Sequence, residues 1–259
     1  MRTRHKVRGV AVAALITAVA VLALVGCETT EAIASSVSTS TNIKNLDDKA
    51  EALYKEKLAA TGDAVKDTNK KLGALAIEAA RQGDAATDNA ASAVSLYRIA
   101  ATAAWVAGPP HNTRLPGLSN KGSGACERAG GNAAQSRDCA VVRMIPSLAL
   151  LDVKADSAQK LRDAGSIPRE SLDGATKLTE EVSTQIQKVL ELRKAALPLP
   201  ESLDQYLQIN LGREFCMLEG LLGQLDENSP PQPMLDRASA ATRNARRSLE
   251  DASMSTTCH

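Results

Sequence analysis

Apolar residues recur at helical spacing along most of the chain. Leu53 and Leu58 stand in one such series, and Val182, Ile186 and Val189 stand in another. Steps of three to five residues place apolar side chains on one face of a helix. The pattern predicts helical segments over about 43–58, 65–80, 87–107, 139–145, 147–165, 168–196, 201–226 and 233–253. Thr-Gly-Asp at 61–63 can end or only bend the first helix, so the first two segments can form one. No segment shows the alternation typical of a strand, so the sequence predicts an all-α fold, an antiparallel bundle of five to seven helices.

The segment 87–107 differs from the other predicted helices because apolar residues occupy most of its sides. It is dense in alanine and carries Val94, Leu96, Ile99 and Trp105. A helix that is apolar all round is buried. We therefore expect this helix to lie at the centre of the bundle and to end at the Gly-Pro-Pro sequence of residues 108–110, because proline removes a backbone donor.

Residues 108–138 interrupt the helical pattern. Gly, Pro, Asn and Ser dominate this stretch, and these residue types favour turns and loops. The sequence predicts one long loop here. A loop can be shortened at little cost in stability, so removing 112–123 should leave the fold intact. Pro146 similarly predicts a break between two short helices, with Ser147 as the N-cap of the second.

The first 26 residues have a different character from the rest. Arg2, Arg4, Lys6 and Arg8 precede an apolar run, residues 10–25, in which only Thr17 is polar. A basic start followed by a short apolar core is typical of a secretory signal peptide. The run is shorter than the roughly 20 apolar residues that span a bilayer. We therefore predict a signal peptide over 1–26 rather than a transmembrane helix.

The signal segment ends in Leu-Val-Gly-Cys, residues 24–27, which resembles the lipobox of bacterial lipoprotein precursors. The resemblance implies that the chain is cleaved after Gly26 and that the Cys27 thiol is acylated, giving a stable membrane anchor, because several acyl chains together hold a protein at a bilayer. Glu28 follows Cys27 where that class would use Asp for inner-membrane retention. This favours the outer membrane, facing the periplasm, while the inner membrane and the cell surface stay open. Residues 27–41 would form the lipidated N-terminus and a flexible tether, and 42–259 a single helical domain.

Four cysteines follow Cys27: Cys126, Cys139, Cys216 and Cys258. An even number in an exported protein indicates disulfides. Three pairings are open, and we favour the nearest neighbours, 126 with 139 and 216 with 258. The first bridge would staple the loop 108–138, and the chain-entropy model gives about 3 kcal/mol for it and about 4 kcal/mol for the second. The spacing matches no zinc pattern, so no metal is predicted.

Charge and composition narrow the classes of function. Without residues 1–26, 27 basic residues stand against 30 acidic ones, a net charge of −3. No basic excess is present to attract nucleic acid, so no nucleic-acid partner is predicted. The three Tyr, one Trp and one Phe leave few rings to line a sugar or small-molecule site, and no cofactor is predicted.

Catalytic motifs are incomplete. Ser157 and Lys160 form Ser-x-x-Lys, but the partner motifs of penicillin-binding enzymes do not occur. The sequence favours a non-enzymatic protein with a structural or protein-partner-binding role in the cell envelope. The alternative is a periplasmic enzyme or ligand-binding protein whose site lies in the loop 108–138 and uses His111, Arg114 or Lys121.

Overall fold

The computed structural model of the chain describes residues 39–258, and within them two compact units are separated at residue 45. Residues 39–45 of the first unit are helical, although the sequence places residues 39–41 in a tether. Cys27, the predicted signal peptide and the remainder of the predicted tether lie outside the described residues. The fold below is that of the described residues of the second unit, 46–258.

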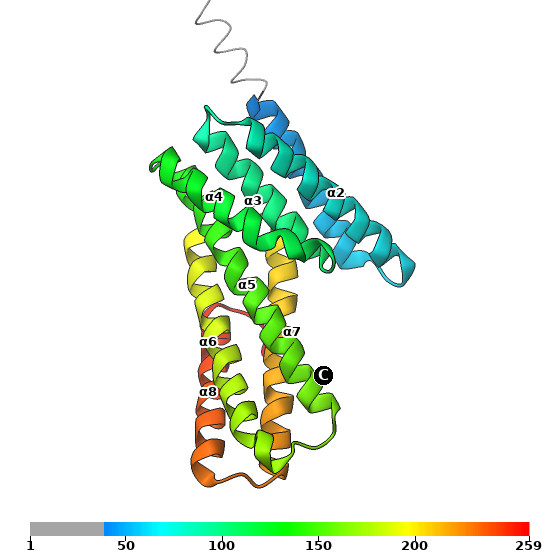
Figure 1. The fold of residues 1–259 in the computed structure, drawn as a ribbon, viewed down its shortest axis with the longest axis vertical. Helices are drawn as coiled ribbons and strands as arrows, with labels where there is room; N and C mark the ends of the chain where they lie inside the picture. The colour runs from blue at the N-terminus through cyan, green and yellow to red at the C-terminus, as the bar shows by residue number, and fades with distance from the viewer. Residues whose placement is uncertain (1–38, 259) are drawn as a thin grey trace, which may run out of the picture. The chain divides into compact units, whose positions relative to one another are not determined.

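The second unit is all-helical over its described residues (Figure 1). Together with the helix over 39–59, the described chain has eight α-helices, which exceeds the predicted five to seven. The further elements are α2 (Asp63–Ala85), α3 (Ala90–Ala107), η1 (His111–Arg114), α4 (Leu115–Ala129), α5 (Ala133–Asp163), η2 (Arg169–Ser171), α6 (Leu172–Ala196), α7 (Glu201–Glu227) and α8 (Gln232–Asp251).

The helices pack as two groups that share α5. In the first group, α3 contacts α2, α4 and α5. In the second, α5 contacts α6 and α7, and α8 packs on both α6 and α7. Helix α5 reaches both groups because its 31 residues extend for about 46 Å at 1.5 Å per residue. Figure 1 shows this arrangement, with α5 running from beside α3 and α4 to the lower ends of α6 and α7.

Helix α3 is the buried centre of the first group, as its composition predicts. Fourteen of its 18 residues are buried, including Ile99 and Val106. It is also the one described helix long and apolar enough to cross a membrane, but 78% of that window lies inside the protein. Its apolar character is therefore accounted for by packing against α2, α4 and α5.

The predicted loop 108–138 is mostly helical, so that prediction is wrong. Residues 111–129 form η1 and α4, and α5 begins at Ala133. Pro116 lies in the first turn of α4, where a missing N–H costs nothing. Gly122 lies against α3 and α5, and a Cβ there would be 2.7 Å from Val142 Cγ1. The glycine therefore permits close helix packing rather than a turn.

The predicted break at Pro146 is also absent, because α5 continues through it. The residues on either side, Met144, Ile145 and Leu148, are each at most 1% exposed. Burial of these side chains offsets the backbone hydrogen bond that proline cannot make. Tertiary packing here outweighs the local signal.

Both disulfides that the sequence favours are present in the structure. Cys126 on α4 is joined to Cys139 on α5, and Cys216 on α7 is joined to Cys258 in the C-terminal segment after α8. The first therefore staples two helices, not a loop. The second holds the C-terminal segment on α7, where Met254 is also buried.

Candidate functional site

The three residues proposed for a loop site serve separate local contacts. The imidazole of His111 packs on α2 at Gly73, where a Cβ would collide with it. Lys121 Nζ lies 2.7 Å from Asp84 Oδ1. Arg114 is exposed at the end of η1. None of the three lines either of the two pockets described below.

Asp84 forms a surface ion pair with Lys121, which is a structural contact rather than the setting of a catalytic acid. The Tyr97 hydroxyl donates to Asp84 Oδ1 at 2.6 Å. The hydrogen bonds from Lys121 and Tyr97 lower the pKa of the Asp84 carboxyl. The carboxylate form is thus favoured, and it links α4 to the end of α2.

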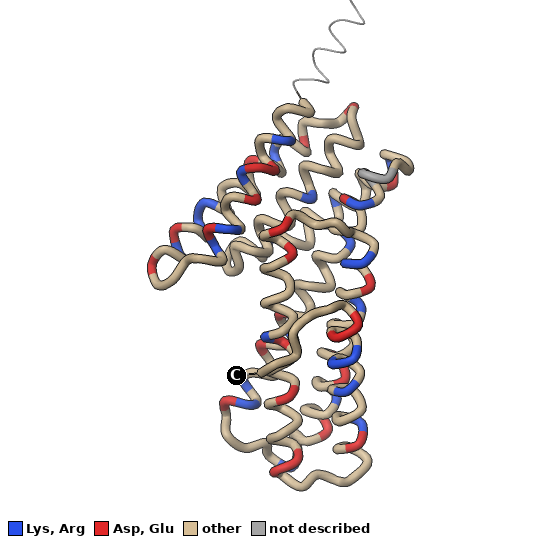
Figure 2. Tube along the Cα trace, turned by 180° about the vertical axis from the view of Figure 1, so that it is seen from behind, with Lys and Arg blue, Asp and Glu red and all other residues tan. Residues whose placement is uncertain are grey.

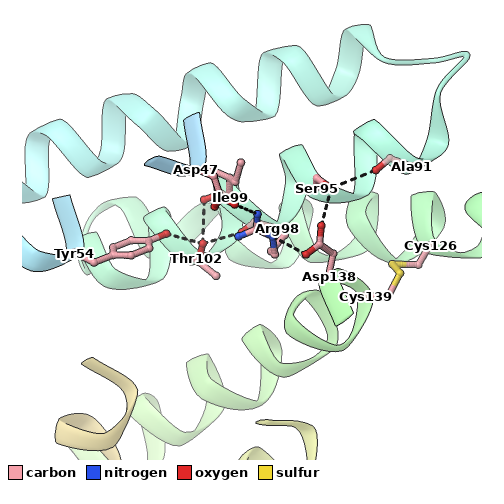
Figure 3. A network of polar contacts seen from close by, with 10 residues as sticks. All are labelled: Asp47, Tyr54, Ala91, Ser95, Arg98, Ile99, Thr102, Cys126, Asp138 and Cys139. Atoms are coloured by element: carbon pink, nitrogen blue, oxygen red, sulfur yellow. Dashed lines mark hydrogen bonds and ion pairs between the residues drawn. A yellow bond between two sulfur atoms is a disulfide. The ribbon is translucent and has the colours of Figure 1, made fainter. Parts of the chain in front are cut away.

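A buried arginine organises the polar interior of the first group (Figure 3). The Arg98 side chain comes from α3 and is only 8% exposed. Its Nη2 donates to Asp47 Oδ2 at 2.9 Å, and its Nε lies 2.9 Å from Asp138 Oδ1 as an ion pair. Three helices meet at this one side chain, since Asp47 belongs to the helix 46–59 and Asp138 to α5.

Neighbouring hydroxyls complete this network. Ser95 donates to Asp138 Oδ2 at 2.6 Å. The hydroxyls of Tyr54 and Thr102 are 2.7 Å apart, and Thr102 donates to the Arg98 carbonyl oxygen at 2.9 Å. Buried polar groups cost free energy unless they are paired. The network pairs most of these groups and joins the helix 46–59 and α5 to α3, while Arg98 Nε meets Asp138 as an ion pair without a hydrogen bond.

The charges of the network stabilise each other. Burial alone lowers the pKa of the Arg98 guanidinium, but Asp138 and Asp47 outweigh burial and raise it. Burial raises the pKa of the Tyr54 hydroxyl, although its hydrogen bond to Thr102 and the nearby Arg98 act in the opposite direction. Tyr54 is therefore neutral and Arg98 charged over the whole physiological range.

A pocket of about 230 Å³ lies beside Arg98. Asp47, Arg98, Arg137 and Asp138 supply its charged lining. The apolar lining comes from Val141 on α5, Ala196 at the end of α6 and the linker of residues 198–200. Both signs of charge and an apolar wall therefore face one small cavity.

The linker wall is held in place by the helix 46–59. Helix α7 begins at Glu201 after Pro200, and it has no side-chain N-cap of its own. Glu51 Oε1 instead accepts from the Ser202 backbone N–H at 2.7 Å. A helix start needs such acceptors, and here another helix supplies one. The contact fixes the linker relative to Asp47.

A second pocket, of about 460 Å³, is lined by Leu197, the residue that precedes this linker. It is formed by the C-terminal ends of α6 and α8 and includes Arg193, Lys194, Leu197 and Asp251. Arg193 is committed to Asp204, with Nε–Oδ1 at 2.7 Å and Nη2–Oδ2 at 2.8 Å. Glu191, Lys194 and Asp251 contribute further charges of both signs to the lining of this pocket.

Two acids, half-buried Asp152 and buried Glu214, lie where α5 meets α3 and α7. Trp105 Nε1 donates to Asp152 Oδ2 at 3.0 Å, and the Trp105 ring meets Tyr206 edge to face at 5.3 Å. Glu214 is 1% exposed and pairs through Oε1 with Arg213, while its Oε2 has no partner among the described atoms. Burial raises the pKa of Asp152, and it raises that of Glu214 to about 7.

The sequence does carry one signal for this site. Arg98 stands alone as a charge within an otherwise apolar helix, and such a charge needs a buried partner. The partners could not have been found, because Asp47 and Asp138 lie far from Arg98 in the chain. No group of three His, Cys, Asp or Glu side chains is placed to hold a metal ion in the part of the chain that the structure describes.

Comparison of the chain with protein-family models, with curated proteins and with solved structures found no match.

Proposed function

We propose that this chain is a lipid-anchored protein of the bacterial cell envelope, held at the outer membrane and facing the periplasm, with a structural or partner-binding role. The observation that carries the proposal is the segment that ends at Cys27. A basic start, an apolar run and Leu-Val-Gly-Cys occur together and in order. Acyl chains on Cys27 would hold the helical unit at the membrane surface.

The disulfides support an exported location. Cys126–Cys139 and Cys216–Cys258 account for every cysteine after Cys27. Structural disulfides form and persist in oxidising compartments such as the periplasm. Residue Cys27 is the one thiol left over, as the lipoprotein proposal requires.

A partner-binding role is supported by exposed aliphatic side chains on α5 and α7. Val153 is 62% exposed and Ile209 is 55% exposed. Large aliphatic groups at such positions contribute nothing to the core, and a partner that covered them would remove their apolar surface from water. His111 and Lys121, by contrast, have contacts within the fold, so they give little support to a loop site.

Photo-crosslinking in intact cells tests this proposal. A crosslinkable residue at Val153 or Ile209 should give one discrete adduct, and one at exposed Lys70 on α2 should not. The adduct should disappear when Cys27→Ser removes the anchor, because the partner and this protein would no longer share a membrane. Equal labelling from all three positions, or an adduct that does not need Cys27, would contradict the proposal.

A further inference from the structure

The pocket beside Arg98 has charged groups that are not fully paired within the protein. Arg137 lines the pocket from the first turns of α5, is exposed, and has no ion-pair partner among the described residues. Asp47 uses Oδ2 for Arg98, and its side chain is still 38% exposed. A carboxylate has about four acceptor sites. One cationic group and one partly open carboxylate therefore face the same cavity.

The other two charged lining residues, Arg98 and Asp138, form what we call the floor of the pocket. Arg98 and Asp138 are largely buried, at 8% and 19% side-chain exposure, and are bound to each other. They are balanced in sign and held in position by Ser95 and Asp47. A ligand would meet a preorganised floor, which reduces the ordering cost of binding.

The remaining wall is apolar. Val141 and Ala196 are buried, and Pro198 and Pro200 have no backbone N–H to offer. This wall favours a ligand with an aliphatic body. The volume of about 230 Å³ is below the range of pockets for drug-sized molecules, so the ligand must be small.

We propose that this pocket binds a small zwitterion of the amino-acid class, with its carboxylate at Arg137, its ammonium at Asp47, and its aliphatic side chain on Val141 and the linker 198–200. The pocket contributes two guanidinium and two carboxylate groups. A simple anion would be repelled by Asp47 and Asp138, and a simple cation by Arg98 and Arg137. A zwitterion satisfies both signs at once. This inference is independent of the partner-binding proposal.

Calorimetric titration of the full chain in detergent tests the ligand class. The probes are L-leucine, L-alanine and L-proline, together with two analogues of leucine: 4-methylpentanoate, which lacks the ammonium group, and 3-methylbutylamine, which lacks the carboxylate. At least one amino acid should bind with a stoichiometry of one, and each analogue should bind about tenfold more weakly than leucine. No binding by any of the three amino acids at millimolar concentration, or binding of an analogue as tight as that of leucine, would overturn the proposal.

Matched variants locate the site. Arg137→Ala should weaken amino-acid binding about tenfold or more, because it removes the charge that the fold does not use. Arg143→Ala is the control, since Arg143 is exposed on the same helix and does not line the pocket. Both variants should keep the wild-type circular dichroism spectrum. Unchanged binding by Arg137→Ala, or an equal loss in Arg143→Ala, would refute the assignment of the ligand to this pocket.

Discussion

At the scale of single residues, Glu214 ties the stability of the protein to pH. Its carboxylate is 1% exposed, and Arg213 neutralises it only in part. Asp152 and Asp156 on α5 add negative charge near it. Burial, opposed by Arg213, raises its pKa from 4.5 to about 7. The folded protein therefore binds a proton here more tightly than the unfolded chain does.

The sign of the pH effect follows from this raised pKa. Between pH 4.5 and 7 the folded state holds more protons at Glu214 than the unfolded state, so this group's contribution to the free energy of unfolding falls as pH rises. A rise from 4.5 to about 7 corresponds to about 3 kcal/mol. Relative to Glu214→Gln, the wild type should lose about that much stability between pH 4.5 and pH 8.

Denaturant unfolding of both proteins across this pH range measures the difference. Subtracting the two curves removes the effects of acids with lowered pKa values, such as Asp204 and Glu180, which titrate in both proteins. A difference that does not change with pH would show that Glu214 is charged in the fold at all these values.

Gly73 offers a second test at this scale, because it determines how η1 packs. Gly73→Ala should destabilise the protein by about 1 to 3 kcal/mol, since its Cβ would collide with the His111 imidazole. The loss should shrink in the double variant with His111→Ala. Gly117→Ala is the control, because a Cβ at Gly117 meets no atom within 4 Å and alanine favours the helix. Thermal unfolding compares these variants and His111→Ala alone with the wild type, and equal effects at Gly73 and Gly117 would contradict the contact.

At the scale of elements, periodicity predicts helices well where apolar residues recur without interruption. The segments 168–196, 201–226 and 233–253 correspond closely to α6, α7 and α8. Glycine and proline lead to a wrong prediction where they lie within a helix. In α4, Gly122 permits close helix packing and Pro116 lies in the first turn. The buried spacing of Leu115, Leu118, Gly122 and Ala125 is helical, but it could be recognised only with α3 and α5 beside it.

The ion-pair partners of Arg98 at the candidate site likewise cannot be predicted from the local sequence. A charge within an apolar helix can be noticed in the sequence. Its ion pairs to Asp47 and Asp138 depend on how three helices meet, and no local pattern encodes that. The disulfides are simpler to predict, because only three pairings exist and each favoured pair joins cysteines that are consecutive in the chain.

The prediction at this scale concerns the contribution of helix α4 to stability. Leu115 is 2% exposed, so Leu115→Ala should cost about 3 kcal/mol of stability. Asn120→Ala on the exposed side of the same helix should change stability by less than about 0.5 kcal/mol. Deleting 112–123, which a true loop would tolerate, should unfold the protein because it removes most of α4.

Urea denaturation followed by circular dichroism separates these outcomes. A deletion variant that stays folded, or a Leu115→Ala variant as stable as Asn120→Ala, would show that residues 112–123 contribute little to the fold.

At the scale of the whole molecule, the surface carries charges of both signs. Figure 2 shows Lys and Arg interspersed with Asp and Glu along the helices. Several form ion pairs across helices, including Lys154 with Glu181 and Arg237 with Glu180. An interspersed surface produces no large field of one sign. Recruitment to a membrane would then depend on the proposed anchor at Cys27 rather than on electrostatic attraction to lipid.

Acylation of Cys27 is the most direct test of the proposal that lipid holds this protein in the envelope. Cells that express the wild type, Cys27→Ser, or the double variant Cys126→Ser with Cys139→Ser should be grown with a clickable palmitate analogue. The wild type and the double variant should incorporate the label and lose residues 1–26. The Cys27→Ser variant should remain unlabelled and uncleaved at Gly26. Undiminished label on Cys27→Ser would contradict the proposal that this protein is held in the envelope by lipid.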